Sequence, residues 1–367
     1  MEKQLHILCS CFLSILTVSV VTIVKGVVRM NTVLLAAMHF VVDFICAWAM
    51  YGFFRQGSGG YENLLIYNFC AFALQMPLGT ILDLLKERID GKIRNRFSMI
   101  WAVFGAVLTA VGALIHPAML GLGNALFHLG GGMEVIEEDL ARNLKGRDLG
   151  VFVAPGAIGL YLGAKAGTEL LVLVLAALAA AILAIVLFWN KGRKAFEQLP
   201  VEKKTSEKIW LLAVCCFAVV ILRSYVGLSV NFSWKSGAVF GLLAVLAVAV
   251  GKVSGGILGA RFGSGRTVCI SLLLAAACFA MGDTPVFGLA ALLLFNMSMP
   301  VTLYMLARAL PHLPGFSFGL LTFGLFLGFL PVYGGIDLHL TGAVGSIISA
   351  VLLIIGEKAV RKDHVSS

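Results

Sequence analysis

Two side chains that can exchange protons stand close together in an apolar stretch near the start of the chain. His39 and Asp43 are four residues apart in LLAAMHFVVDFICAWAM, so on a helix they share one face and can reach each other. A carboxylate beside an imidazole in a medium of low dielectric constant can hold or release a proton as its surroundings change. We therefore expect Asp43 to carry a proton, assisted by His39 and by His128, which stands in another apolar stretch. A static, buried, hydrogen-bonded pair is the alternative.

A cation, Arg223, also stands in an apolar stretch, FAVVILRSYVGLSV. A guanidinium group does not deprotonate in proteins, so Arg223 must pair with a carboxylate or contact an anionic ligand. An internal pair with Asp43 and a contact with an anionic substrate are both open. Lys252 lies nearer the end of its apolar stretch, and we expect its ammonium group to extend to water.

The composition shows which elements must hold these side chains. Of the 367 residues, 60% are hydrophobic and 13% are charged, against about 45–50% and about 25% in soluble domains. A soluble globular protein is thereby excluded, and at about 20 apolar residues per crossing the chain has room for roughly twelve membrane helices. The 41 glycines suit close helix contacts in a bilayer. The 8 cysteines show no metal-ligand spacing, so we expect no cofactor and no metal.

Apolar runs separated by charges, Gly and Pro predict an all-α integral membrane protein with twelve transmembrane helices. The predicted spans are residues 31–54, 62–85, 97–116, 117–135, 149–166, 169–189, 209–231, 236–258, 266–282, 285–309, 315–333 and 338–356. The polar segment 190–208 is predicted to be a cytoplasmic loop between an N-terminal six-helix bundle, 31–189, and a C-terminal one, 209–356. Residues 357–367 form the predicted tail.

Basic residues are concentrated in the loops after the even-numbered spans, in the central segment and in the tail, while the opposite loops hold only Arg55, Lys165 and Lys235. The positive-inside rule then predicts that both ends of the twelve-helix body are cytoplasmic, in the cell inner (plasma) membrane. These loops account for the net charge of +9, so we expect no nucleic-acid partner. One of these cytoplasmic loops is expected to be solvated, with acidic and basic side chains that pair with one another. Its charged residues are Glu134, Glu137, Glu138, Asp139, Arg142, Lys145 and Arg147.

Residues 1–29 precede this body and have three interpretations: an additional helix, a leader, or sequence upstream of a later start codon. The run 5–24 is apolar enough to span a membrane, but no small-residue cleavage site follows it, which disfavours a leader. We favour Met30 as the natural start, because residues 25–27 can be encoded by a purine-rich stretch similar to a ribosome-binding site.

Depth along each span singles out polar side chains near the middle of the membrane. Asp43 lies about 18 Å into a hydrocarbon core of roughly 30 Å, and His128, Arg223 and Asn296 lie at comparable depth in their spans. A charged side chain there costs about 2.5–3.5 kcal/mol, so its presence suggests a role in binding or coupling. Transporters built from repeats bind substrate near the midplane, and the expected substrate cavity contains Arg223, Asn296, Asn124 and Gln75. For Asn124 and Gln75, interhelical hydrogen bonding is the alternative.

Two segments occupy matching places in the two halves, each before a basic loop. The first ends the second span with Gly79 and Asp83, and the second ends the eighth span with Gly256, Arg261, Gly263 and Arg266. They resemble the major facilitator superfamily signature Gly-x-x-x-Asp-Arg-x-Gly-Arg-Arg, which follows the second helix and recurs in weaker form after the eighth. The resemblance implies two six-helix halves, a cavity lined by the first, fourth, seventh and tenth helices, and a conformational role for these residues. Ala260 stands where the second copy would have its acid, and a solvated helix end is the alternative for Asp83.

Three shorter stretches narrow this resemblance. Residues 39–44 (HFVVDF), 123–128 (GNALFH) and 146–150 (GRDLG) are similar to the fosmidomycin-resistance branch of the superfamily, in which a proline usually follows the histidine of the fourth helix. Here Leu129 follows it. The pair Pro155-Gly156 resembles, in scrambled form, the Gly-Pro element of antiporters, which implies exchange against protons.

The leading hypothesis is a secondary active transporter that exports a small organic compound or drug in exchange for protons, by alternating access between the two halves. We expect a monomer that interacts with the lipid bilayer, protons and a small-molecule substrate. Proton-coupled uptake of a small anionic metabolite is the first alternative, favoured if Arg223 faces the cavity unpaired. A non-transporting membrane sensor or an enzyme is the second, and the lack of a recognisable catalytic constellation argues against the enzyme.

Overall fold

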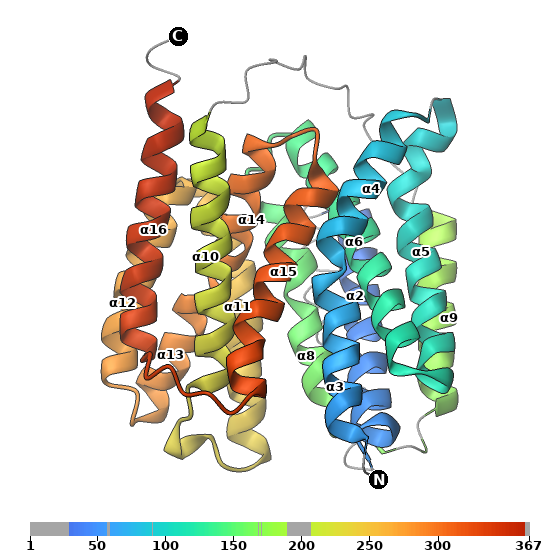
Figure 1. The fold of residues 1–367 in the computed structure, drawn as a ribbon, viewed down its shortest axis with the longest axis horizontal. Coiled ribbons are helices and arrows are strands. Elements are labelled where there is room, and N and C mark those ends of the chain that lie inside the picture. The colour runs from blue at the N-terminus through green and yellow to red at the C-terminus, as the bar shows by residue number, and fades with distance from the viewer. Residues whose placement is uncertain are drawn as a thin grey trace.

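The described part of the chain is helical throughout. The computed structural model describes residues 29–56, 59–89, 91–167, 169, 171–188 and 207–363, and these ranges contain helices and no strand. The helices lie side by side in two groups, drawn from blue to green and from yellow to red in Figure 1. The predicted all-α membrane fold is thereby confirmed. Our interpretations of residues 1–29 and of the central segment 190–208 fall almost wholly outside the described residues.

The elements follow the predicted spans, several of them in consecutive pieces. The first group contains α2 (Met30–Ala49) with η1 (Met50–Phe54), α3 (Gly60–Asn68) with η2 (Phe69–Ala73) and α4 (Gln75–Glu87), α5 (Gly91–Ile115), α6 (Pro117–Ala141), α7 (Arg147–Val153) with α8 (Pro155–Gly163), and α9 (Leu171–Phe188). The second group contains α10 (Glu207–Ser229), η4 (Ser233–Lys235), α11 (Ala238–Phe262), α12 (Ser264–Ala280), α13 (Pro285–Asn296) with α14 (Ser298–Ala309), α15 (Pro314–Tyr333) and α16 (Gly342–Asp363).

Eight of the described helical segments are long and apolar enough to cross a membrane. They differ in how much of their surface the rest of the protein covers. The apolar stretch of Met30–Phe54 is 83% buried inside the protein, whereas that of Ala238–Phe262 is 22% buried. Helix α2 is therefore an enclosed, central helix, and α11 turns most of its surface outward, where a bilayer would cover it.

Proline sets where several helices begin, because it has no backbone N–H and its fixed φ suits the first helical turn. Helices with proline at this place are α6, α8, α13 and α15. Only His116 separates α5 from α6, and its Nδ1 accepts a hydrogen bond from Ala118 N at 3.2 Å, so the two helices meet in a tight turn. Ala154 alone separates α7 from α8, so the fifth predicted span is a broken helix.

Several helices extend beyond their predicted ends. Helix α6 continues to Ala141, and the acids that we expected in a solvated loop lie on it, buried; Glu134 and Asp139 are each 1% exposed. The expectation of a solvated loop is wrong because paired carboxylates can remain on a buried helix. Helix α16 likewise continues to Asp363. The salt bridges on α6 join Lys86 to Glu137, and Arg29 and Arg142 to Glu138.

Two sets of helices join the groups: α4 packs along α15, and α7 and α8 pack along α11. Glycine permits the close approach in both places. A Cβ at Gly79 would meet the backbone of Gly315, and a Cβ at Gly150 would meet the backbone of Lys252 and Gly256. Larger residues at these positions would push the two groups apart.

Candidate functional site

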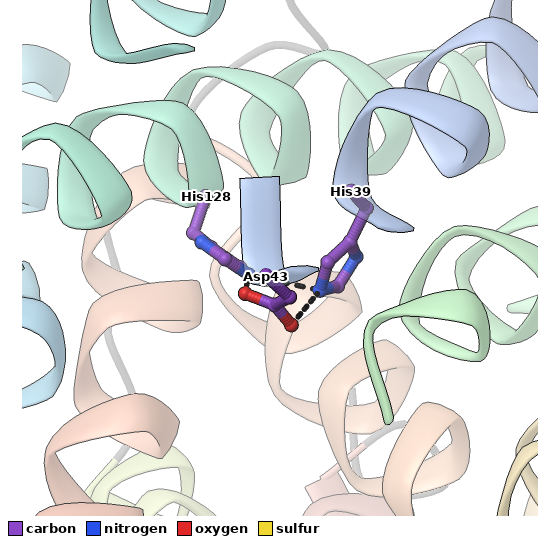
Figure 2. A group of neighbouring side chains, drawn as sticks. All are labelled: His39, Asp43 and His128. Atoms are coloured by element: carbon purple, nitrogen blue, oxygen red, sulfur yellow. Dashed lines mark hydrogen bonds and ion pairs between the residues drawn. The ribbon is translucent and has the colours of Figure 1, made fainter. Parts of the chain in front are cut away.

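Helices α2 and α6 bring four polar side chains together inside the first group. Helix α2 supplies His39 and Asp43, and α6 supplies Asn124 and His128. Each pair is four residues apart, so both members lie on one helix face. The four residues are between 1% and 8% exposed. Figure 2 shows the side chains of His39, Asp43 and His128 converging on one point.

The carboxylate of Asp43 lies beside both imidazoles. Its Oδ2 is 3.2 Å from His39 Nε2, and its Oδ1 is 3.6 Å from His128 Nε2. Asn124 Nδ2 donates a hydrogen bond to the same Oδ1 at 3.1 Å, and the two Nε2 atoms lie 2.9 Å apart. We refer to His39, Asp43 and His128 as the His–Asp–His cluster.

Backbone carbonyls fix the tautomer of each imidazole. His39 Nδ1 lies 2.8 Å from Phe152 O, and His128 Nδ1 lies 2.8 Å from Asn124 O. A carbonyl oxygen can only accept, so both Nδ1 atoms carry a hydrogen and donate. Two neutral rings would then turn unprotonated Nε2 atoms toward each other at hydrogen-bond distance. One additional proton converts this contact into an N–H···N hydrogen bond, with Asp43 balancing the positive charge.

The break between α7 and α8 covers the cluster from a third side. A Cβ at Gly156 would collide with His39 Nε2 and Asp43 Oδ2, so only glycine leaves room for the cluster. Phe152, whose carbonyl accepts from His39, lies just before the break. The helix is interrupted at Ala154, before Pro155, which has no N–H. The carbonyls just before this interruption accept hydrogen bonds from side chains.

The next carbonyl at the break, that of Val153, contacts the second group. Lys252 Nζ of α11 donates a hydrogen bond to Val153 O at 3.1 Å. Our expectation that Lys252 extends to water is wrong: the side chain is half-buried and points across to α7. Consecutive carbonyls of one broken helix therefore connect the His–Asp–His cluster with a cation from the opposite group.

Arg223 of α10 is 8% exposed, and its Nε is buried without a hydrogen-bond partner. Within the described ranges, its guanidinium group forms no ion pair with Asp43 and no hydrogen bond. Of the two alternatives for Arg223, the internal pair is therefore absent in this arrangement.

Two of the expected cavity residues satisfy their amides on their own helices. Asn296 Nδ2 donates to Leu292 O at 2.8 Å, at the junction of α13 and α14. Gln75 Nε2 donates to Ala71 O at 2.5 Å, and its buried Oε1 has no partner among the described residues. Among the described residues neither side chain bonds to the cluster, whereas Asn124 donates to Asp43.

Asp83 of α4 connects the two groups at the first conformational segment. Its Oδ1 accepts a hydrogen bond from Gly315 N at 2.9 Å, and its Oδ2 accepts one from Phe316 N at 2.8 Å. These are orphan N–H groups of the first turn of α15, where the helix dipole also favours a negative charge. Gly79 lets α15 approach closely enough for these bonds. Asp83 is 2% exposed and is therefore no solvated helix end.

Among the described residues, the second segment has no equivalent bond across the groups. Gly256 packs on the backbone at the start of α7, but the N–H groups there, of Gly146 and Asp148, donate to Asp139 of α6, at 2.8 and 3.2 Å. The acid missing at Ala260 of α11 is thus replaced by one from the first group itself. Gly263, with φ of 93°, forms the tight turn from α11 to α12, and Arg261 and Arg266 are exposed.

The cluster also has the donor set of a metal site. One ligand atom from each of His39, Asp43 and His128 lies within 4.8 Å of the others, and two imidazoles with a carboxylate could coordinate a divalent transition metal ion. The expectation that the protein uses no metal stays a prediction.

A second link between the groups joins the start of α3 to the end of α15, away from the end of α15 that Asp83 contacts. Sequence reasoning missed this link. The rings of Tyr61 and Tyr333 stack with centroids 4.0 Å apart. Tyr61 OH donates to Tyr333 O at 2.5 Å, and Tyr333 OH donates to Tyr61 O at 3.1 Å. Both tyrosines lie at predicted span ends, where tyrosine is common, so nothing in the sequence marks the pairing.

Comparison by sequence finds no matching family model and no matching curated protein. Comparison of structures does find relatives in fold. The chain is similar to FucP, described as a major facilitator superfamily transporter in the outward conformation, with a TM-score of 0.59 and 12% identity over 90% of this chain and 99% of that chain. FucP is also described as the E. coli fucose:proton symporter.

Two further solved structures share the fold. The human organic anion transporter MFSD10 matches with a TM-score of 0.54 and 14% identity over 90% of this chain and 95% of that chain. A bacterial homologue of the iron transporter ferroportin matches with a TM-score of 0.52 and 16% identity over 91% of this chain and 99% of that chain. The chain therefore has the major facilitator fold, and its matched structures are transporters rather than enzymes. These comparisons do not address the resemblance to the fosmidomycin-resistance branch.

Proposed function

We propose that the protein is a secondary active transporter that moves a small organic solute by alternating access and couples this movement to protons. The observation that carries the proposal is the His–Asp–His cluster, where a buried carboxylate lies beside two imidazoles whose Nε2 atoms are 2.9 Å apart. A charged side chain buried in the membrane costs free energy, and a role in proton exchange explains its presence. The fold, which the chain shares with transporters, supports the same assignment.

The proposed movement is a rocking of the two groups about their shared interface. Asp83 closes the interface at one end of α15, and the stacked Tyr61 and Tyr333 close it at the other. Opening either side requires breaking one of these links while the other persists. Loading or release of the proton alters hydrogen bonds at the α7–α8 break. Because this break contacts α11 through Lys252, the change can be transmitted to the relative movement of the two groups.

Export in exchange for protons is our proposal for the direction, with the cytoplasmic ends and the inner (plasma) membrane assigned as in the sequence analysis. It rests on the resemblance to the fosmidomycin-resistance branch and on Pro155-Gly156. Gly156 supports it by its contact with the cluster, since a change at the α7–α8 break would reach His39 directly. We propose a monomer as the transporting unit.

Proton-coupled uptake of a small anion is the second candidate. The observation that favours it is the lack of any internal partner for the Arg223 guanidinium among the described residues. A proton and an anion would then travel in the same direction.

The test uses everted membrane vesicles with an imposed pH gradient, to which panels of phosphonate, lipophilic and small-acid compounds are added. Wild type is compared with Asp43→Asn and with Asp283→Asn, which removes an exposed carboxylate. We expect at least one compound to collapse the gradient in wild type and Asp283→Asn, and not in Asp43→Asn. Equal collapse in all three proteins would refute the assignment of the proton to the cluster.

A further inference from the structure

The ligand atoms of the His–Asp–His cluster, which converge on one point (Figure 2), lie at separations close to those of a tetrahedral metal site. The two Nε2 atoms are 2.9 Å apart, Asp43 Oδ2 lies 3.2 Å from His39 Nε2, and Asp43 Oδ1 lies 3.6 Å from His128 Nε2. Bonds of about 2.0–2.1 Å from a tetrahedral Zn²⁺ ion place its ligand atoms about 3.3–3.4 Å from one another. The observed distances lie on both sides of this value, so shifts of less than about half an ångström would form the site.

Both imidazoles are already oriented for a metal ion. His39 Nδ1 donates to the carbonyl of Phe152 on α7, and His128 Nδ1 donates to the carbonyl of Asn124 on α6. Metal-binding histidines almost always donate their second ring N–H to a carbonyl, a carboxylate or water, which fixes the tautomer and raises the basicity of the ligating nitrogen. The two carbonyls leave both Nε2 lone pairs available beside Asp43, so metal binding requires no change of tautomer.

The surroundings of the cluster fit a cation with one further ligand. His39, Asp43 and His128 are between 5% and 8% exposed. Asn124, which is 1% exposed, donates from Nδ2 to Asp43 Oδ1, and its own Oδ1 is buried without a hydrogen-bond partner among the described residues. Three protein ligands leave the fourth position of a tetrahedral ion to water, and such a water can donate to this oxygen. Gly156, which packs on the cluster, adds no side chain that would fill the site.

We propose that His39 Nε2, His128 Nε2 and the Asp43 carboxylate bind a divalent transition-metal ion of the Zn²⁺ class. Two imidazole nitrogens favour such an ion over Mg²⁺ and Ca²⁺, which take oxygen ligands. The carboxylate partly neutralises the ion, and the imidazoles keep the tautomers that their backbone acceptors fix. In the part of the chain that the structure describes, no other three His, Cys, Asp or Glu side chains bring ligand atoms within 4.8 Å of one another.

The metal ion and a proton compete for the same atoms. An N–H···N hydrogen bond between the two Nε2 atoms uses both lone pairs, and so does a bound metal ion, so metal binding releases that proton to water. One consequence rests on the proposed function: the ion should stop solute-dependent proton movement, because it fixes α2 to α6 beside the α7–α8 break. The ion is then an inhibitor and not a resident cofactor, and a chelator leaves transport intact.

The test measures Co²⁺ binding to the purified, full-length protein without a histidine tag, in detergent and a buffer that does not bind metals. Tetrahedral Co²⁺ absorbs visible light much more strongly than hydrated Co²⁺, so the spectrum reports both binding and geometry. We expect a saturable spectrum at one Co²⁺ per chain in wild type. Zn²⁺ should remove this spectrum by displacing Co²⁺, and Mg²⁺ should not.

Matched variants locate the bound ion. His128→Gln removes one ligand and should weaken Co²⁺ binding by about 100-fold or more, because even an outer partner of a ligand contributes about 10- to 100-fold. His339→Gln removes an exposed imidazole that lies 3.2 Å from Asp337, and it should bind as wild type does. Unchanged binding in His128→Gln, or lost binding in His339→Gln, would indicate an adventitious ion only and overturn the inference. The absence of a saturable spectrum in wild type would overturn it equally.

A second measurement uses wild type alone, so it decides the question even where His128→Gln fails to fold. Pulsed electron paramagnetic resonance of bound Cu²⁺ shows how many imidazoles coordinate the ion. The cluster predicts two imidazoles, whereas the exposed pair of His339 and Asp337 supplies one. Coupling to a single imidazole, or to none, would contradict the assignment.

These outcomes are separable from the proposed function. If Co²⁺ binds at the cluster while Zn²⁺ leaves proton movement in vesicles unchanged, the metal site stands and the assignment of the proton to the cluster fails. If a compound moves protons in vesicles through Asp43 while no metal ion binds, proton-coupled transport stands and the metal site is wrong.

Discussion

Replacing Asp83 by Asn tests whether this carboxylate holds the two groups together. The carboxylate accepts two hydrogen bonds from the first turn of α15, at 2.9 and 2.8 Å. An asparagine side chain has one acceptor oxygen, so one of these bonds is lost and its N–H group faces an amide N–H₂. The negative charge at the helix N-terminus is lost as well.

The size of the effect follows from these two losses. A hydrogen bond to a charged group contributes about 1.5–3 kcal/mol, and a charge at a helix N-terminus contributes about 0.3–1 kcal/mol. The closed arrangement at this end should therefore lose about 2–4 kcal/mol relative to the open one. That corresponds to a shift of roughly 30- to 1000-fold in the ratio of open to closed molecules.

The assay measures the distance between spin labels at Arg88, beside the end of α4, and Arg308 of α14, in a protein without other reactive cysteines. Both positions are exposed. Asp83→Asn should add or enlarge a population at longer distance, whereas Glu87→Gln, which removes an exposed carboxylate of the same helix, should not. The reasoning is refuted if the distance distributions of Asp83→Asn and wild type coincide.

Three further changes have defined outcomes. Gly156→Ala places a methyl group on the cluster and should abolish solute-dependent proton movement in vesicles, whereas Gly227→Ala, which has open space around its Cβ, should leave it unchanged; equal activity would contradict the close packing. Tyr61→Phe removes one hydrogen bond to Tyr333, worth about 0.5–1.5 kcal/mol, and should expose this end of α15 to thiol labelling up to about tenfold more; unchanged labelling would refute this. Treatment with a metal chelator should leave proton movement unchanged, and loss of movement that added metal restores would contradict the expectation of no metal.

The sequence predicted most of the fold because a bilayer leaves few choices for the backbone. Apolar runs of sufficient length must be helices, and the described helices follow the predicted spans. The ends of the helices were less predictable, because charged residues were interpreted as belonging to loops. On α6 the buried acids Glu137 and Glu138 pair with Lys86 and Arg29, and pairing with distant residues cannot be read from one span alone.

Part of the candidate site was predictable from spacing. The separation of His39 and Asp43 placed them on one helix face, and depth suggested His128. The carbonyl of Phe152 was not predictable, since a backbone acceptor has no residue type that marks it. The expected direction of the Lys252 side chain was wrong, because depth alone does not tell whether a long side chain extends to water or to a neighbouring helix.

Solute-dependent proton movement in proteoliposomes tests the central claim most directly. Purified wild type, Asp43→Asn and Asp283→Asn are compared in vesicles with an imposed pH gradient, using a solute that the vesicle panel identifies. The proposal that the cluster carries one proton predicts one proton moved per solute in wild type and Asp283→Asn, and none in Asp43→Asn. Proton movement in Asp43→Asn equal to that of wild type, or solute movement in wild type without protons, would contradict the account.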